Sequence, residues 1–321
     1  MLMDSYKREV TYLRVSVTER CNFRCQYCMP EKPFSWVPKE NLLSYEELFN
    51  FIKIGIDNGI TKIRITGGEP TTRDDLDILI KMITEYDSNI DIGLTTNGYL
   101  LASMIEKLKN AGLKRINISL DSLQKETMHY ITKKDVYLKV MQGIEKAVAY
   151  GFKVKLNSVI MKNVNEDEII PLFEFAKKLG VELRYIEFME NNFANQHIQG
   201  LNSNEILAIL SSKYSFNLSS TSFDGPATLY ETIDGYKFGM IEPHKHDFCA
   251  TCNRLRLSAE GDLIPCLYFD EAMSIKDAIR DNDISQAENI LKTVVQNKPE
   301  KNRWNVTETE TSSRAFYQTG G

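Results

Sequence analysis

Short strand-like runs alternate with amphipathic helical patterns between residues 12 and 188. The strand-like runs are Tyr12–Thr18, Lys62–Thr66, Asp91–Thr96, Lys114–Leu120, Phe152–Ile160 and Val181–Phe188. The helical patterns are Ser44–Asn58, Asp74–Tyr86, Leu101–Ala111, Val136–Tyr150 and Glu166–Leu179. Because strand–helix–strand crossovers run in one hand and place their strands in parallel, this order predicts a parallel sheet covered by helices.

Polar side chains alternate with apolar ones inside four of these strands. The polar positions are Arg14, Ser16 and Thr18; Lys62, Arg64 and Thr66; Asn117, Ser119 and Asp121; Lys153, Lys155 and Asn157. Strands of a doubly wound sheet are apolar on both faces, and a closed TIM barrel carries branched apolar residues inside. The alternation therefore predicts an α/β fold with a partial (β/α)6 barrel, an incomplete TIM barrel whose wide polar lumen holds ligand. The sixth strand fits less well, because Glu187 falls in register with Leu183.

From Asn202 onward the alternation stops. We expect a short helix, a polar loop, two hairpins and further helices, at Asn202–Leu210, Tyr214–Pro226, Leu229–Ile241, Arg254–Leu267 and Ala272–Asn297. Residues 1–10 are expected to be only partly ordered, and Lys298 begins a charged tail. We expect two domains, 1–215 and 216–321, the second an α+β extension that covers the open barrel.

Composition narrows the function classes. The net charge of −5 and pI near 5.6 argue against bulk electrostatic binding to nucleic acid. No run approaches the roughly 18 apolar residues that a membrane span requires. The N-terminus has no apolar signal-peptide region, so a cytoplasmic protein is expected.

All six cysteines fall in two groups, Cys21/Cys25/Cys28 and Cys249/Cys252/Cys266. In a reducing compartment this distribution favours metal ligation over disulfides. Three thiolates are one short of a closed tetrahedral site, whereas an iron–sulfur cubane held by three thiolates keeps one iron open. A zinc site completed by a histidine remains the alternative for each group; the candidates are His129, His197, His244 and His246.

The first group, spaced three residues then two with Tyr27 before the last cysteine, resembles the signature of the radical S-adenosylmethionine (SAM) enzymes. In that family the open iron is chelated by the amino and carboxylate groups of SAM. Thr66-Gly67-Gly68-Glu69-Pro70 resembles the motif that receives the SAM amino group. The resemblance implies SAM contacts at Tyr27, Gly68, Glu69, Ser119, Asn157 and Met189.

The residues around the second group resemble one branch of that superfamily, the GTP 3′,8-cyclases that begin molybdenum-cofactor biosynthesis. The resemblance rests on Phe248–Leu257 and on Gly261-Asp262-Leu263 leading to Cys266. It implies a second [4Fe-4S] cluster whose open iron holds the guanine of GTP. Spacing alone leaves a zinc ribbon using His244 or His246 open.

Inward-facing cations could bind a triphosphate in this acidic protein, because arginine forks suit phosphate oxygens. The strand alternation turns Arg14, Arg64 and Lys155 inward, while Arg254 and Arg256, two apart, share one face. The resemblance implies GTP contacts at Arg64, Thr95, Lys155, Arg254 and Arg256, and the further candidates from the sequence are Arg14, Arg73 and Arg184.

The chain ends in Gly320-Gly321, which by itself indicates only a disordered terminus. In the cyclase family such a tail enters the active site and is required for turnover. The resemblance therefore gives both glycines a catalytic role, with Arg314, Phe316 and Tyr317 available to anchor the tail.

The reaction implied is conversion of GTP to 3′,8-cyclo-7,8-dihydro-GTP, in which a 5′-deoxyadenosyl radical abstracts the ribose 3′-hydrogen and the carbon radical attacks C8. Two [4Fe-4S] clusters and SAM serve as cofactors, and a flavodoxin- or ferredoxin-type protein donates electrons. The product would pass to cyclic pyranopterin monophosphate synthase, and a homodimer is allowed. Two alternatives stay open: another radical SAM enzyme with an auxiliary cluster, such as a peptide maturase, and a non-catalytic iron–sulfur carrier or zinc module.

Overall fold

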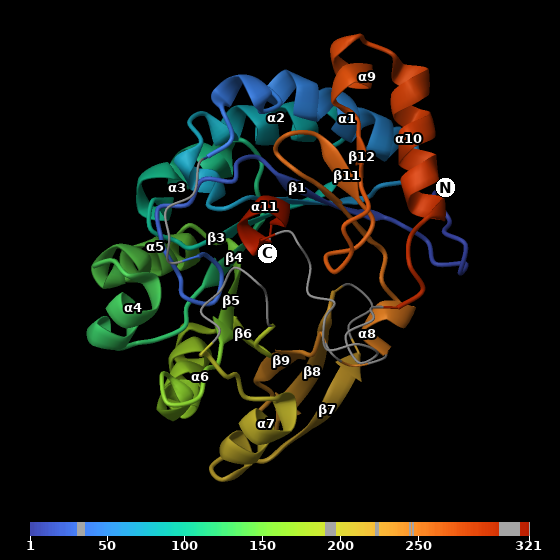
Figure 1. Ribbon diagram of the computed structural model, residues 1–321. Coiled ribbons are helices and arrows are strands. Elements are labelled where there is room, and N and C mark those ends of the chain that lie inside the picture. The colour runs from blue at the N-terminus through green and yellow to red at the C-terminus, as the bar shows by residue number, and fades with distance from the viewer. Residues whose placement is uncertain are drawn as a thin grey trace.

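The computed structural model describes residues 1–30, 36–189, 197–221, 225–243, 245, 247–301 and 315–320. Within them the strands form a single 12-stranded sheet in the order β12-β11-β10-β1-β2-β3-β4-β5-β6-β9-β8-β7 (Figure 1). The strands are β1 Tyr12–Ser16, β2 Lys62–Thr66, β3 Asp91–Thr96, β4 Arg115–Ser119, β5 Lys153–Val159, β6 Glu182–Ile186, β7 Phe216–Thr221, β8 Ala227–Thr232, β9 Lys237–Ile241, β10 Arg254–Leu257, β11 Asp262–Ile264 and β12 Met273–Ser274.

Helices follow the strands along the chain. They are α1 Tyr45–Asp57, α2 Leu76–Tyr86, α3 Leu101–Asn110, α4 Lys125–Thr132, α5 Tyr137–Ala149, α6 Ile169–Leu179, α7 Ser203–Ser211, α8 Asp247–Ala250, α9 Lys276–Arg280, α10 Ile284–Gln296 and α11 Phe316–Thr319, with 3-10 turns at Lys39–Asn41, Pro70–Thr72 and Glu166–Glu168. Helix α1 begins with the capping box that the sequence predicts, in which Ser44 and Glu47 satisfy each other's backbone N–H groups.

Strands β1 to β6 are parallel neighbours in sequence order, as predicted. Their apolar side chains, such as Leu13, Ile63 and Ile116, are fully buried in the core between sheet and helices. The alternation therefore leaves the polar side chains on the opposite face of the sheet. Because the pairing is in register, Arg14 lies beside Arg64, and Ser119 lies beside Asn157.

The C-terminal part of the chain extends both edges of this parallel sheet. Strand β10 pairs in parallel with β1, and β9 pairs in parallel with β6. Antiparallel strands continue outward from each, through β11 to β12 and through β8 to β7. The hydrogen-bonded sheet therefore stays open, and the chain has a parallel-rich α/β fold.

Two expectations are wrong, and one helix was not predicted. The segment Tyr214–Pro226 contains strand β7 instead of only a polar loop, because Phe216 packs against Tyr230 and Phe238 and the backbone pairs with β8. Helix α4 had no predicted counterpart. Residues 1–10 are ordered, with buried Leu2 and Val10.

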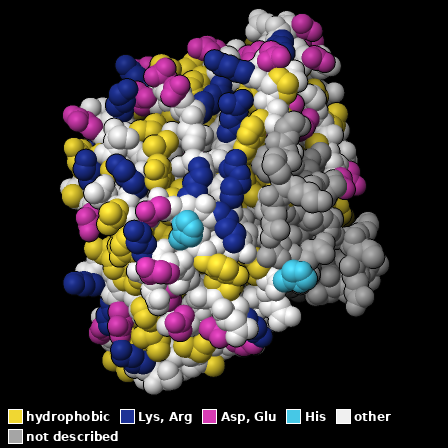
Figure 2. Space-filling model, turned by 60° about the vertical axis from the view of Figure 1, so that its left-hand side comes forward, with side chains coloured by type: hydrophobic (Ala, Val, Ile, Leu, Met, Phe, Trp, Pro, Cys, Tyr) yellow, Lys and Arg dark blue, Asp and Glu magenta, His cyan; other side chains and the backbone are white. Residues whose placement is uncertain are grey.

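The face drawn in Figure 2 carries basic, acidic and apolar side chains together. No helix among the described residues is long and apolar enough to cross a membrane. The boundary between domains 1–215 and 216–321 stays a prediction.

Candidate active site

One cavity of about 560 Å³ lies against the polar face of the parallel sheet. All six cysteines line it, although the two groups are far apart in the sequence. The predicted site residues that line it, besides the cysteines, are Arg14, Tyr27, Arg64, Gly68, Glu69, Thr95, Ser119, Asn157, Lys155, Arg184, Met189, Arg254, Arg256 and Gly320. The polar alternation therefore locates a real cavity, and both cysteine groups belong to it.

The first cysteine loop is fastened to the end of β2 by backbone contacts. The N–H groups of Gly68 and Glu69 donate to the carbonyls of Thr18 and Arg20, both at 2.7 Å. A Cβ atom on Gly67 or Gly68 would lie 2.4 Å from a carbonyl oxygen of Thr18 or Glu19. Glycine at both positions therefore leaves room for the backbone that leads to Cys21.

Burial dominates the chemistry of the first three thiols. It raises the pKa of Cys21 and Cys28 to about 12, and it also raises the pKa of Cys25, with the neighbouring Cys21 and Cys28 adding to the effect. Thiols of this kind ionise when a metal replaces the proton. Among the described residues, no three His, Cys, Asp or Glu side chains converge as ligands of a single ion would. Three thiols from one loop are the donor set of a [4Fe-4S] cubane, in which each thiolate binds a different iron.

Glu69 is buried and fully engaged with its surroundings. Its carboxylate accepts hydrogen bonds from Thr71, from the Thr96 hydroxyl at 2.7 Å and from the Asn97 N–H at 2.6 Å. Burial raises the pKa of Glu69 despite these donors. Asn97 in turn donates to Asn22 at 2.8 Å, so Glu69 helps to fix the loop that carries Cys21.

Tyr27 connects the same loop to β4 and β5. Its hydroxyl donates to Asp121 at 2.8 Å, and Asp121 also accepts from the Val159 N–H at 2.9 Å. Burial raises the pKa of Asp121 to about 6. Nearby, the buried Thr95 Oγ1 and Asn157 Oδ1 have no hydrogen-bond partner among the described residues. Buried polar atoms are rarely left unpaired, so these two indicate a polar ligand.

A cluster of cations lies on β10, β1 and β2, around Arg14, Arg64, Arg254 and Arg256. The register places Arg14 between Arg64 and Arg256. Burial and the neighbouring guanidinium charges lower the pKa of Arg256 to about 9. Cations this close together favour an anion in the cavity.

Lys155 and Arg184 are less free to bind an anion. Both contact Glu182, with Lys155 Nζ at 2.9 Å and Arg184 Nε at 2.6 Å from its carboxylate. Burial lowers the pKa of Lys155 to about 8, with Arg184 adding to the effect. This arrangement can compensate part of the charge that the two cations bring to the cavity.

Arg73 does not line the cavity, so the structure does not support its predicted GTP contact. Its guanidinium donates to the carbonyls of Val17 at 2.7 Å and Leu43 at 2.8 Å and stacks on Tyr45. Arg73 follows the glycine motif in the sequence, but it comes directly after the 3-10 turn Pro70–Thr72 and its side chain lies outside the cavity. Arg73 therefore supports the fold.

Tyr12 is a cavity residue that the sequence reasoning missed. Its hydroxyl accepts from Arg64 Nε at 3.2 Å. Burial alone would raise the pKa of Tyr12, but the charges of Arg64, Arg14 and Arg254 outweigh it and lower the pKa to about 7. The signal was available, because Tyr12 stands two residues before Arg14 in the same alternation.

The second cysteine group has a cationic environment. Cys252 Sγ accepts from Arg254 Nε at 3.4 Å and from Lys298 Nζ at 3.5 Å. Although burial opposes it, these two charges lower the pKa of Cys252 to about 6. Lys298, the first residue of the charged tail that the sequence predicts, is buried and only 3% exposed. His244 and His246 lie outside the described residues.

The C-terminal residues 315–320 lie within the curve of the parallel strands (Figure 1). The Gly320 carbonyl accepts from Arg14 and from Thr66 Oγ1, and Arg256 donates to the Thr319 carbonyl at 3.0 Å. Tyr317 packs edge-on against Trp36, and its backbone N–H donates to the Cys28 thiol. The tail thus contacts both ends of the cavity. Gly321 and Arg314 lie outside the described residues.

Comparison with known proteins assigns the fold to a class. Residues 15–176 match the model of the radical SAM superfamily, and residues 181–304 match the model named Molybdenum Cofactor Synthesis C. The fold resembles that of SuiB from Streptococcus suis bound to S-adenosylmethionine, with a TM-score of 0.64 at 16% identity over 86% of this chain. The alignment covers 65% of that longer structure. The chain belongs to the radical SAM superfamily, whose members use a [4Fe-4S] cluster and SAM.

Curated relatives narrow the assignment. The chain is 61% identical to the GTP 3′,8-cyclase of Aliarcobacter butzleri and 58% identical to that of Sulfurimonas denitrificans, each over 100% of both chains. Within the superfamily, the chain therefore belongs to the GTP 3′,8-cyclase family.

Proposed function

We propose that this chain is a GTP 3′,8-cyclase that converts GTP to 3′,8-cyclo-7,8-dihydro-GTP at the start of molybdenum-cofactor biosynthesis. One observation carries the proposal: two separate three-cysteine groups line the same cavity, and a cluster of arginines lines it beside the second group. A radical made at one end can then act on a substrate held at the other without leaving the protein.

At the first end, Cys21, Cys25 and Cys28 would hold a [4Fe-4S] cluster. When bound, that cluster and SAM would supply the 5′-deoxyadenosyl radical. Polar atoms of the strands surround the same space, and the unpaired Asn157 Oδ1 is suited to a SAM hydroxyl or amino group. The proposed SAM residues are Tyr27, Gly68, Glu69, Ser119, Asn157 and Met189, all of which line the cavity.

At the other end, Cys249, Cys252 and Cys266 would hold a second [4Fe-4S] cluster. The cationic wall beside it suits a triphosphate, since guanidinium groups bind phosphate oxygens bidentately. The proposed GTP residues are Arg14, Arg64, Thr95, Lys155, Arg184, Arg254 and Arg256. Tyr12 joins them as the acceptor that orients Arg64.

The open sheet is proposed to be a partial (β/α)6 barrel, with residues 216–321 forming an extension that covers its opening. Its sheet additions at both edges and the tail contacts to Arg14 and Arg256 support this arrangement. The tail would exclude water and order the arginines, and Gly320-Gly321 would take part in turnover. A flavodoxin- or ferredoxin-type donor would supply electrons, and cyclic pyranopterin monophosphate synthase would receive the product.

The test is anaerobic incubation with SAM, dithionite and GTP, followed by mass spectrometry. The proposal expects 5′-deoxyadenosine together with a GTP-derived product isomeric with GTP. ATP serves as the matched substrate control, because it carries the same triphosphate without guanine. Deoxyadenosine with no GTP-dependent product would reject the cyclase and favour another radical SAM activity.

A further inference from the structure

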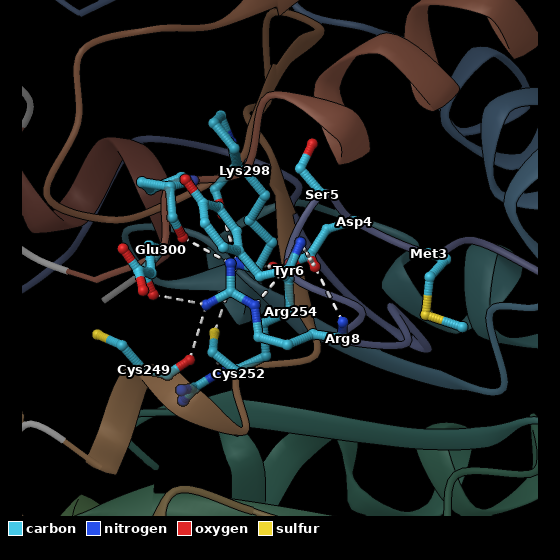
Figure 3. A network of polar contacts seen from close by, with 12 residues as sticks. Met3, Asp4, Ser5, Tyr6, Arg8, Cys249, Cys252, Arg254, Lys298 and Glu300 are labelled. Carbon is cyan, nitrogen blue, oxygen red and sulfur yellow. Dashed lines mark hydrogen bonds and ion pairs between the residues drawn. The ribbon is translucent and has the colours of Figure 1, made fainter.

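Residues 4–8 and 298–300, for which the sequence predicts neither helix nor strand, meet beside the second cysteine group. Residues Asp4–Arg8 form a tight turn, in which the Asp4 carboxylate accepts from the backbone N–H groups of Tyr6 and Arg8, each at 2.9 Å. The same carboxylate binds Arg8 Nε at 2.6 Å, and both side chains are almost completely buried. Asp4 therefore holds the Arg8 guanidinium in one orientation (Figure 3).

From that turn, Arg8 connects two distant parts of the chain. Its guanidinium donates to the Cys249 carbonyl at 2.8 Å, to the Pro299 carbonyl at 2.6 Å and to the Glu300 carbonyl at 2.9 Å. A planar guanidinium with fixed donors can bridge three carbonyls in this way, whereas a lysine ammonium cannot match the same geometry. Arg8 thus fixes the backbone of Cys249 relative to residues 299–300.

Lys298 makes the complementary connection from the same segment. Its ammonium donates to the Pro265 carbonyl at 2.9 Å and the Arg254 carbonyl at 3.0 Å, and it lies 3.5 Å from Cys252 Sγ. A buried ammonium is costly unless its donors are used, and here all three are directed at the walls of the second cysteine group.

These contacts reach every cysteine of that group. Arg8 holds the backbone at Cys249, Lys298 donates to the thiol of Cys252, and Lys298 also holds the residue directly before Cys266. We propose that Arg8 and Lys298 are positioning residues that hold Cys249, Cys252 and Cys266 in the arrangement that binds the second cluster. This inference rests on the proposed function.

The first cysteine group provides an internal reference. Among the described residues, neither Arg8 nor Lys298 has a hydrogen bond or ion pair with Cys21, Cys25, Cys28 or the loop between them. Loss of either side chain should therefore weaken one cluster and spare the other. A general loss of stability would weaken both.

The experiment compares anaerobically reconstituted wild-type, Arg8→Ala, Lys298→Met and Arg280→Ala proteins under an iron chelator. Arg280→Ala is the control, because Arg280 makes an exposed ion pair with Glu47 away from both cysteine groups. Cys266→Ala identifies the iron-loss phase of the first cluster. We expect the second-cluster phase to be at least about tenfold faster in Arg8→Ala and Lys298→Met, with the first-cluster phase unchanged.

A spectroscopic signature separates positioning from simple folding. In Lys298→Met, the electron paramagnetic resonance signal of the reduced second cluster should change, because a donor to Cys252 is lost, while the SAM-induced change in the first cluster's signal persists. Wild-type kinetics and spectra in both variants, or equal acceleration of both phases, would overturn the inference. A wild-type protein that binds one cluster only would instead reject the proposed function.

Discussion

The two cysteine groups have the same number of thiols in one cavity, yet the protein holds them by different means. The first is fixed mainly by backbone hydrogen bonds, such as those of Gly68 and Glu69 to Thr18 and Arg20, and its thiols have a raised pKa because they are buried without nearby cations that outweigh burial. The second is held by side chains from distant segments, and Arg254 and Lys298 lower the pKa of Cys252 to about 6, although burial opposes the shift.

The different surroundings of the two cysteine groups suit them to different roles. Backbone hydrogen bonds to the strand ends hold the first loop in one geometry beside the polar face of the sheet. A site surrounded by cations favours negative charge on its thiolates and beside them, which suits a triphosphate. The electrostatics of the cavity are therefore asymmetric, with the acidic Glu69 near one end and the arginines at the other.

The largest expected effect on activity comes from removing one cysteine from either group and comparing the two variants. Cys21→Ala removes a ligand of the first cluster, so SAM cleavage should fall to the background of the cluster-free protein. Cys266→Ala should retain reductive cleavage of SAM and lose the GTP-derived product. Chromatography of deoxyadenosine and of the cyclised nucleotide measures both, and equal loss of deoxyadenosine in the two variants would contradict the separation.

The next largest effect on turnover concerns the C-terminal residues 315–320, which contact both ends of the cavity. Gly320 has φ +78°, and a Cβ there would lie 2.2 Å from Thr66 Cγ2. Gly320→Ala should displace the tail and lower GTP turnover on the order of a hundredfold, because misplacement by about 1 Å can have that cost. Iron content should stay unchanged.

Gly151→Ala is the matched control for the tail prediction. Gly151 has φ +70°, but a Cβ there meets nothing within 4 Å. It therefore carries the same kind of backbone strain without the clash in the cavity. Equal turnover in the two alanine variants would show that tail placement does not matter.

Tyr12 tests the cationic end through pH. Its folded-state pKa of about 7 lies below the usual 10, because the arginine charges outweigh burial. Between these two values the unfolded chain holds the proton and the folded chain does not, so stability relative to Tyr12→Phe should rise with pH across that interval. At pH 8.5 the wild-type protein should show more phenolate absorbance than Tyr12→Phe, and this difference should disappear when GTP neutralises the arginines. An absorbance difference that GTP does not change would argue against a triphosphate beside Tyr12.

The smallest effect concerns the turn that supports the second group. Lys7 has φ +65°, a conformation that favours glycine. Lys7→Gly should raise the free energy of unfolding by about 0.5 kcal/mol, once the added freedom of the unfolded chain is subtracted. Chemical denaturation measures this gain, and Lys133→Gly, at φ +59° after α4, provides a comparison beside the first cysteine loop, where the Thr132 carbonyl accepts from the Arg24 N–H at 2.9 Å.

The sequence predicted the parallel strands and the cavity face because both follow from the period of two along each strand. Strands β2 and β3 agree with the prediction to the residue, and Arg14, Arg64 and Lys155 do line the cavity. Tyr12 lies in the same alternation, and its position two residues before Arg14 places it on the cavity face.

Other features could not be read from local pattern. Arg8 contacts Glu300, 292 residues away along the chain, and Lys298 contacts Cys252, 46 residues away. Arg73 seemed well placed beside the glycine motif, but the turn at Pro70–Thr72 directs it to backbone carbonyls outside the cavity. The partners of these side chains depend on tertiary packing, which cannot be predicted from the periodicity of the sequence.

Metal analysis after anaerobic reconstitution tests the two-cluster cavity most directly. Iron, sulfide and zinc should be measured for the wild-type protein and for Cys266→Ala. The account predicts about eight irons and eight sulfides per chain in the wild type, about four of each in the variant, and no zinc in either. About four irons with one zinc in the wild-type protein would contradict it, because the second group would then be a closed structural site.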